Sequence, residues 1–191
     1  MKLIVGLGNP GRTYAGSRHN VGSLIVKQLA KVYKCPLKRD AGAHSFTGKA
    51  DIEGEAVILA LPVTYMNLSG FAVKLLVKKH KIGPGDLLVI CDDLDLELGR
   101  IKIRPDGSSG GHRGLESVME NLGSKEFARL RVGIGRPGGN AEVTDYVLSS
   151  FQAEEKQGLE EAVEKACSCS AAWVKNGISK SMDIYNRKNK T

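Results

Sequence analysis

Cysteine is scarce in this chain, and long hydrophobic runs are missing. The 191 residues include only four cysteines, which are too few and too irregularly spaced for a disulfide framework. We therefore expect all four to be reduced. Cys167 and Cys169 lack a second pair of ligands, so a structural zinc site is a weak alternative. No stretch approaches the roughly 18 apolar residues that a membrane span needs, so no membrane association is expected.

Other extremes of composition are absent as well. With 41% hydrophobic and 26% charged residues the chain is neither disordered nor fibrous. Met1 and Lys2 lead directly into the strand-like Leu3, Ile4 and Val5 without a signal-peptide pattern, so we expect a cytoplasmic protein. No linker, repeat or low-complexity segment divides the sequence. Residues 1–191 are therefore predicted to form one domain.

Acidic residues are outnumbered, 21 against 28 lysines and arginines, which gives a net charge of +7. Lysines cluster in residues 74–81, whereas glutamates dominate residues 154–164. A basic excess with an uneven distribution favours a polyanionic partner such as a nucleic acid, although many basic domains bind none.

Apolar segments with strand character alternate with amphipathic segments along the chain. Strands are expected at residues 2–7, 44–52, 56–61, 86–91, 100–104 and 129–134, and helices near residues 21–32, 68–76, 115–122 and 154–175. This alternation predicts an α/β protein, a single three-layer α/β/α domain with a mixed, mostly parallel sheet covered by helices on both faces. Because ligands in such folds bind beyond the carboxyl ends of strands, loops 6–11, 62–67 and 92–95 should converge on one site.

The first of these loops matches a dinucleotide-binding pattern. Gly6, Gly8 and Gly11 follow a strand with the spacing G-x-G-x-x-G. However, the first good helix starts only near Asn20, and no acidic residue stands about 20 positions later to bind a ribose. A tight turn that presents Asn9 is the favoured interpretation, and a dinucleotide site is a minor alternative.

A second pattern, at Ser109, matches the nucleophile elbow of serine hydrolases, G-x-S-x-G. Only His112 follows this serine, and it is too close in sequence to act as its base. The interpretation that we favour for residues 107–114 is a flexible anion-binding loop or lid.

His19 precedes the first expected helix, and Asp92 ends a buried strand. A carboxylate bonded to one ring nitrogen of a histidine raises the basicity of the other nitrogen, which is what activation of water requires. The sequence alone leaves open whether His19 and Asp92 meet. The acidic residues Asp92, Asp93 and Asp95 are also compatible with a Mg²⁺ site.

Carboxamides and aromatic rings accompany these groups. Asn9 and Asn67 each offer donors and an acceptor suited to an amide or ester carbonyl, although Asn67 could instead cap the following helix. Tyr14 and Tyr65 could stack on a nucleobase or be ordinary partly buried side chains.

Taken together, several motifs make this sequence resemble one family. They are Val5-Gly-Leu-Gly-Asn-Pro-Gly11, Tyr14, Arg18-His-Asn20, Thr64-Tyr-Met-Asn-Leu-Ser-Gly70, Asp92-Asp-Leu-Asp-Leu96, Gly110-Gly-His112 and Arg129-Leu-Arg-Val-Gly-Ile-Gly135. In this order they resemble the bacterial-type peptidyl-tRNA hydrolases, and the resemblance runs from Leu3 to about Tyr185. It implies hydrolysis of the ester between a peptide and the 3′-terminal ribose of tRNA that has left the ribosome, which recycles the tRNA.

The resemblance also implies roles for individual residues. His19 matches the general base, and Asp92 matches the carboxylate that supports it. Asn9 and Asn67 match amides that hold the peptide and the terminal adenosine region. Further positions match contacts to the tRNA end and to its 5′ phosphate: Tyr14, Tyr65, Met66, Arg104 and Arg131. We expect the reaction to need no metal or cofactor. The expected partner is peptidyl-tRNA, and the protein is expected to act as a monomer without an obligate protein partner.

One position departs from the family. Arg113 follows His112 where the family usually has asparagine, and a guanidinium cannot accept a hydrogen bond. Arg113 is therefore predicted to contact the substrate, either at the oxyanion or at a phosphate. The departure also leaves open a second function, that of a non-catalytic RNA-binding relative with the same fold.

Overall fold

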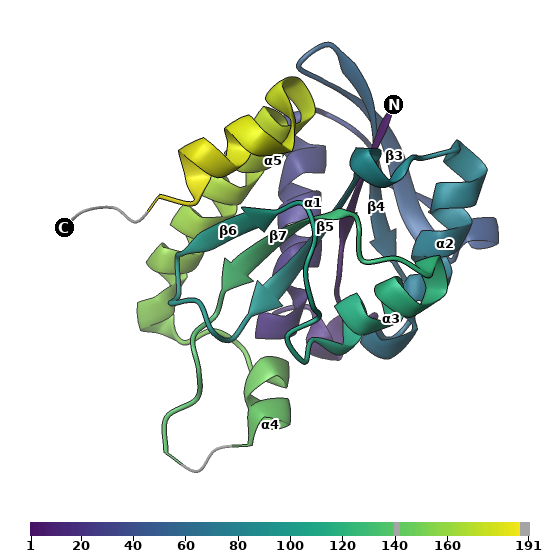
Figure 1. The fold of residues 1–191 in the computed structure, drawn as a ribbon. Coiled ribbons are helices and arrows are strands. Elements are labelled where there is room, and N and C mark those ends of the chain that lie inside the picture. The colour runs from purple at the N-terminus through teal and green to yellow at the C-terminus, as the bar shows by residue number, and fades with distance from the viewer. Residues whose placement is uncertain (140–141, 188–191) are drawn as a thin grey trace.

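A seven-stranded sheet between two layers of helices forms the protein, as the computed structural model shows (Figure 1). The structure describes residues 1–139 and 142–187. Within this part of the chain no helix combines the length and the apolar character that crossing a membrane requires. The predicted α/β class with helices on both faces of the sheet is confirmed.

The sheet has parallel strands at its centre and antiparallel strands at both edges. Its order is β2 (Lys38–Asp40), β3 (Ser45–Ile52), β4 (Glu55–Pro62), β1 (Lys2–Gly6), β5 (Leu87–Asp93), β7 (Ala128–Gly133) and β6 (Ile101–Arg104). The neighbours β4, β1, β5 and β7 are parallel, whereas β2 and β3 at one edge and β6 at the other pair antiparallel. The carboxyl ends of the central strands therefore meet at one edge of the sheet.

The alternation of side chains along each central strand builds two cores. Ile4 packs into the core beneath α1 (Val21–Val32) and α5 (Lys156–Tyr185), whereas its neighbours Leu3 and Val5 pack into the core beneath α2 (Ser69–His80) and α3 (Arg113–Leu122). Because successive residues of a strand point to opposite faces, an unbroken apolar run is what a doubly covered strand requires.

The sequence did not predict two short elements, β2 and α4 (Val143–Leu148). β2 has only three polar residues, and α4 forms a single short helix in a region for which no element was predicted. The predicted last helix is confirmed, but α5 continues to Tyr185 across a break at Gly177, whose φ of 78° is not helical. His44, expected in a strand, instead has a left-handed backbone just before β3.

Gly6 and Gly8 of the first loop serve close packing rather than a phosphate cradle. A Cβ on Gly6 would lie 2.3 Å from the Gly22 carbonyl oxygen, and one on Gly22 would lie 2.3 Å from the Ile90 oxygen. Helix α1 starts only at Val21, ten residues after Gly11, so its N-terminus does not follow the glycines. The dinucleotide alternative therefore lacks the helix geometry that it needs.

The four cysteines are free thiols, as predicted. Burial raises the pKa of Cys167 to about 11 and that of Cys169 to about 12. These thiols are therefore protonated near neutral pH and do not form a reactive or metal-binding pair.

Candidate active site

A cleft of about 540 Å³ lies at the carboxyl ends of the central strands. The predicted loops supply its walls after β1, β4 and β5, so their convergence is confirmed. Its lining also includes side chains from α3, α4 and β7, and the predicted residues among the lining are Asn9, His19, Tyr65, Met66, Asn67, Asp92, Arg113 and Arg131.

His19 and Asp92 meet in this cleft. His19 lies in a short 3-10 helix, Arg18–Asn20, immediately before α1, and Asp92 lies near the end of β5. The Nδ1 atom of His19 is 2.9 Å from Oδ1 and 3.0 Å from Oδ2 of Asp92. Since a carboxylate only accepts hydrogen bonds, Nδ1 carries the proton and Nε2 keeps its lone pair. The pairing that the sequence left open is present.

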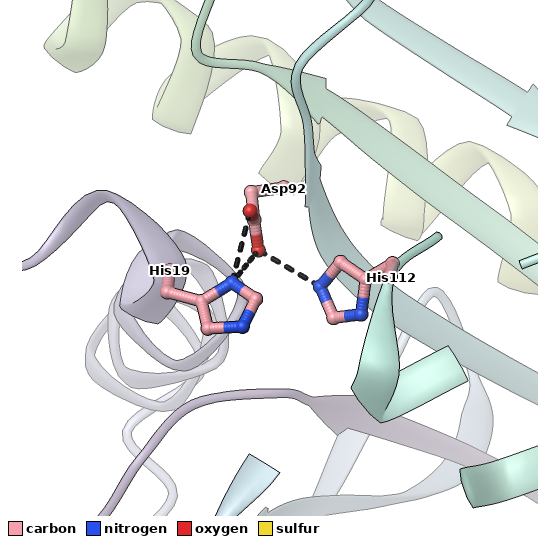
Figure 2. Close-up of side chains that lie close together, drawn as sticks. All are labelled: His19, Asp92 and His112. Carbon is pink, nitrogen blue, oxygen red and sulfur yellow. Dashed lines mark hydrogen bonds and ion pairs between the residues drawn. The ribbon is translucent and has the colours of Figure 1, made fainter. Parts of the chain in front are cut away.

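His112 binds the same carboxylate from the opposite side (Figure 2). Its Nε2 atom is 2.9 Å from Oδ1 of Asp92. Its other ring nitrogen, Nδ1, accepts hydrogen bonds from the backbone N–H groups of Gly114 at 3.1 Å and Leu115 at 3.2 Å, so His112 is also the N-cap of α3. An acceptor at Nδ1 requires the proton on Nε2, and His112 therefore donates to Asp92.

Asp92 thus receives two imidazole N–H groups while its side chain is only 3% exposed. Burial alone would raise the pKa of Asp92, but electrostatic attraction and hydrogen bonds from the rings of His112 and His19 outweigh this effect and hold the pKa well below its ordinary value. Asp92 therefore stays ionised at neutral pH and holds both rings.

The arrangement of these groups argues against a cation at the acidic strand end. Nδ1 of His112 accepts backbone N–H groups, which keeps the proton on the Nε2 atom that a metal would need. Asp93 pairs with Arg131 at 2.9 Å, and Asp95 accepts from Nε of Arg136 at 2.8 Å. Each of the three carboxylates thus has an arginine or imidazole partner in the described part of the chain, which argues against the Mg²⁺ alternative.

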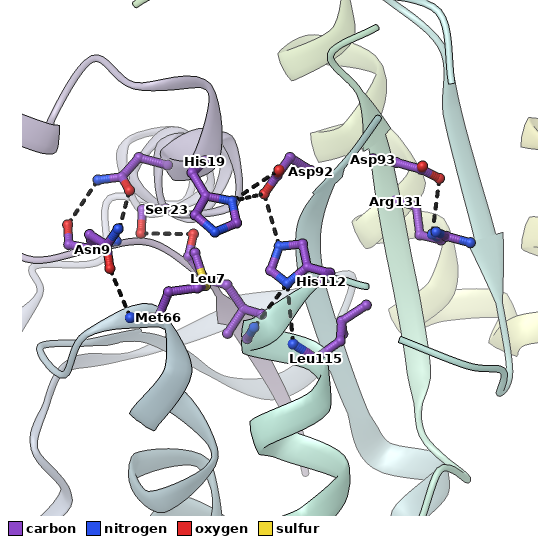
Figure 3. Close-up of polar contacts among 12 residues, drawn as sticks. Leu7, Asn9, His19, Ser23, Met66, Asp92, Asp93, His112, Leu115 and Arg131 are labelled. Carbon is purple, nitrogen blue, oxygen red and sulfur yellow. Dashed lines mark hydrogen bonds and ion pairs between the residues drawn. The ribbon is translucent and has the colours of Figure 1, made fainter. Parts of the chain in front are cut away.

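The carboxamide of Asn9 is bound to the protein through its oxygen, Oδ1. Its Oδ1 accepts the backbone N–H of Met66 at 2.8 Å (Figure 3). Its own backbone N–H and carbonyl bind the Asn20 side chain at 2.7 and 2.9 Å. Asn20 is buried, which fixes the loop that carries Asn9. With Oδ1 occupied, Nδ2 is the group that Asn9 can offer as a donor to a ligand.

The remaining predicted residues divide into two groups. Met66 is buried in the floor of the cleft, while Tyr65, Asn67 and Arg113 are exposed on its rim. Neither helix start near Asn67 is capped by a side chain, so its capping interpretation is wrong.

Tyr14 and Arg104 do not line the cleft. Tyr14 is half-buried in the 3-10 helix Arg12–Tyr14. Arg104 is exposed and pairs with Arg129, three residues along β7 from Val132, which is the partner of Asp92. At strand spacing this offset is about 10 Å. The cleft therefore does not unite all the predicted contacts.

Ser109 lacks the partner that a nucleophile requires. In residues 1–139 and 142–187 its hydroxyl contacts only the backbone N–H of Gly111, at 3.3 Å, and it lies outside the cleft lining. The serine hydrolase pattern is therefore a coincidence of glycine spacing.

Sequence reasoning missed three parts of the site. They are the two contacts of His112, the hydrogen bonds of the Asn20 side chain to the backbone of Asn9, and the wall formed by α4. Each depends on residues that are not neighbours in the sequence. The sequence held a signal for His112 alone, because it stands three residues before the helix predicted at residues 115–122, near the place where an N-cap is expected.

Comparisons with known proteins point to one family. The family model described as peptidyl-tRNA hydrolase matches residues 3–191. A protein of Rhodopirellula baltica named peptidyl-tRNA hydrolase is 44% identical over 188 residues, 97% of each chain, and one of Geobacillus kaustophilus is 46% identical over 97% of this chain and 100% of its own.

Solved structures are similar over nearly the whole length. A peptidyl-tRNA hydrolase in complex with N-propanol has a TM-score of 0.93 at 38% identity and covers 100% of this chain and 97% of its own. The enzyme of Acinetobacter baumannii has a TM-score of 0.90 at 39% identity, with 96% of this chain and 93% of its own covered. This chain therefore belongs to the peptidyl-tRNA hydrolase family, and it is an enzyme that hydrolyses peptidyl-tRNA.

Proposed function

We propose that His19 is the general base of this reaction and that Asp92 holds it in its reactive tautomer. The single observation that supports this most strongly is the contact of Nδ1 with both oxygens of an ionised, buried Asp92. This contact leaves Nε2, the other ring nitrogen of His19, as the basic atom in the cleft. A positioned base of this kind contributes about 10²- to 10⁴-fold to a reaction rate.

The reaction proceeds through attack of water on the ester carbonyl. Nε2 of His19 takes one proton from the water while its oxygen bonds to the carbonyl carbon, which forms a tetrahedral oxyanion. The oxyanion collapses, the bond to the ribose 3′-oxygen breaks, and this oxygen receives the proton from Nε2. Peptide and tRNA are released, and His19 returns to its neutral form without a covalent intermediate.

We infer that Asn9 recognises the peptide. Its free Nδ2 donor suits the carbonyl of the first peptide bond, which a blocked amino end has and a free aminoacyl group lacks. Tyr65, Met66 and Asn67 continue this wall and would contact the terminal adenosine. Substrates with a free ammonium group would leave a polar group mispaired there.

We also infer that arginines bind the phosphates of tRNA. Arg113, exposed at the first turn of α3, could reach an oxyanion or a phosphate near the ester, and Arg131 lines the same cleft. The distance of Arg104 from Asp92 suits a phosphate at the 5′ end rather than the reacting nucleotide. Tyr14 would contact the tRNA end outside the cleft.

The remaining expectations follow from the substrate and the site. All groups of the mechanism come from one chain, so we propose that residues 1–191 act as a single domain and as a monomer, without a cofactor or metal. Because peptidyl-tRNA is a product of translation, we place the activity in the cytoplasm.

Release of an N-acetylaminoacyl group from tRNA in the presence of EDTA tests the proposal. We expect rapid cleavage of the blocked substrate and little cleavage of the unblocked aminoacyl-tRNA. In His19→Ala, turnover should fall by about 10² to 10⁴ while tRNA affinity stays nearly unchanged, because the base acts in the chemical step.

Two outcomes would contradict this proposal. Full activity of His19→Ala would exclude His19 as the base, and loss of activity in EDTA that added metal restores would exclude a metal-free reaction.

A further inference from the structure

We propose that His112 is a positioning residue for catalysis: it holds the carboxylate of Asp92 through Nε2 while it caps α3 through Nδ1. This inference rests on the proposed roles of His19 and Asp92. It adds a second imidazole that does not itself transfer a proton, because both of its nitrogens are already bound within the protein.

The distances define the two contacts of this ring. Nε2 is 2.9 Å from Oδ1 of Asp92, and Nδ1 lies 3.1 and 3.2 Å from the N–H groups of Gly114 and Leu115. The two N–H groups keep Nδ1 unprotonated, so the donor to Asp92 is always present. The rigid start of α3 thereby fixes the position of a carboxylate on β5.

This contact matters because, in the part of the chain that the structure describes, the two imidazoles are the hydrogen-bond partners of the Asp92 carboxylate. Its side chain is 3% exposed, and within residues 1–139 and 142–187 the partners of its oxygens are His19 and His112. Without His112 the carboxylate keeps one donor and can rotate about its side-chain bonds. His19 would then lose the fixed orientation that aims Nε2 at the substrate.

The neighbourhood explains why the ring cannot shift. A Cβ added to Gly114 would come within 3.0 Å of Cε1 of His112 and 2.4 Å of Sδ of Met66. His19 lies on the other side, with ring centroids 4.8 Å apart. His112 is therefore held by packing on both sides as well as by its hydrogen bonds.

Substitution by asparagine separates the two contacts. Asparagine is among the best N-caps and would accept the same backbone N–H groups, but its short side chain cannot also reach Asp92. Alanine loses both contacts. We therefore compare His112→Asn with His112→Ala for kcat, KM and thermal stability, with N-acetylaminoacyl-tRNA as the substrate.

We expect both variants to lose kcat by about tenfold to a hundredfold, the effect of one lost hydrogen bond to a charged group, with KM nearly unchanged. Only His112→Ala should also unfold at a lower temperature. Wild-type kcat in His112→Asn would reduce His112 to a helix cap and overturn the inference. A raised KM at unchanged kcat would make it a substrate contact and would overturn it as well.

A double-mutant cycle with Asp92→Asn tests whether His112 acts through Asp92. If it does, His112→Asn should reduce kcat little further in the Asp92→Asn protein. A full additional loss would overturn the inference. His19→Ala in the same assay keeps the two proposals apart: an active His19→Ala contradicts the proposed base, whereas an inactive His19→Ala beside a fully active His112→Asn contradicts only the role of His112.

Discussion

At the scale of single residues, the site is defined by which polar atoms are already bound. The oxygens of Asp92 accept hydrogen bonds from two imidazoles, and Oδ1 of Asn9 accepts one from the backbone N–H of Met66. Among His19, Asp92 and Asn9, the groups left for a substrate are Nε2 of His19, an acceptor of protons, and Nδ2 of Asn9, a hydrogen-bond donor. This division matches an ester hydrolysis that needs one base and one carbonyl ligand.

Replacing Asn9 by aspartate tests the assignment of its donor. One carboxylate oxygen can still accept the N–H of Met66, but the other faces a substrate carbonyl with an acceptor in place of a donor. We expect kcat/KM for N-acetylaminoacyl-tRNA to fall by about a hundredfold, more than in Asn9→Ala, because two acceptors then oppose each other. Equal losses in steady-state kinetics of the two variants would show that Nδ2 does not donate to the substrate.

The sequence predicted which residues come together in the cleft better than it predicted the residues that hold them in place. His19, Asp92 and Asn9 stand at loop and strand ends, where a parallel sheet gathers its ligand contacts, so the topology alone brings them together. The clamp of Asn20 on the backbone of Asn9 and the hydrogen bond from His112 to Asp92 depend on side-chain positions within about one ångström. Spacing along the chain does not carry that information.

At the scale of elements, a buried arginine ties the wall of the cleft to the segment of the proposed base. Arg18 precedes His19 and makes two hydrogen bonds with Glu155, at 2.8 and 2.6 Å, next to α5. Its guanidinium lies over the rings of Tyr146 in α4 and Phe151, at 4.3 and 4.9 Å, and its backbone N–H donates to the carbonyl of Ser149. The position of α4 thus depends on the same turn that presents His19.

Removing the charge of Glu155 should weaken this connection in a pH-dependent way. Hydrogen bonds from Arg18 lower the pKa of Glu155, so its stabilising effect is present above the ordinary pKa of a glutamate and is lost as the pH falls through the lower value in the folded protein. We expect Glu155→Gln to lower the free energy of unfolding by about 1–2 kcal/mol at pH 7. Urea titrations should find this difference shrinking below pH 4; a constant difference would contradict the ion pair as its cause.

Length and polarity explain which elements the sequence revealed. β1 and β5 are buried on both faces and therefore appear as unbroken apolar runs. β2 has three polar residues at the sheet edge, and α4 has six residues of which none is buried, so neither leaves a periodic pattern. The position of α4 depends on the contacts of Arg18 with the rings of Tyr146 and Phe151, which only the folded chain provides.

At the scale of the whole molecule, the arginines proposed to bind tRNA lie both at the cleft and at the edge of the sheet. Arg131 and Arg113 lie at the cleft, and Arg104 lies further along the sheet at the exposed edge strand β6. A tRNA whose 3′ end enters the cleft would therefore meet arginines both at the reacting ester and at about 10 Å along β7 and β6. Phosphates, rather than bases, are the groups that such side chains bind without regard to sequence.

The salt dependence of tRNA binding tests this arrangement. Each phosphate contact releases counterions, so loss of one contact should reduce the slope of log affinity against log salt by about 1. We expect Arg104→Ala to weaken tRNA binding, to reduce this slope and to raise KM with kcat unchanged, because Arg104 lies away from the reacting atoms. Lys180→Ala, which removes the same charge from an exposed site on α5, is the matched control and should change neither the tRNA affinity nor the slope. Equal effects of the two variants would mean that only net charge attracts the tRNA, and Arg104 would then have no phosphate of its own.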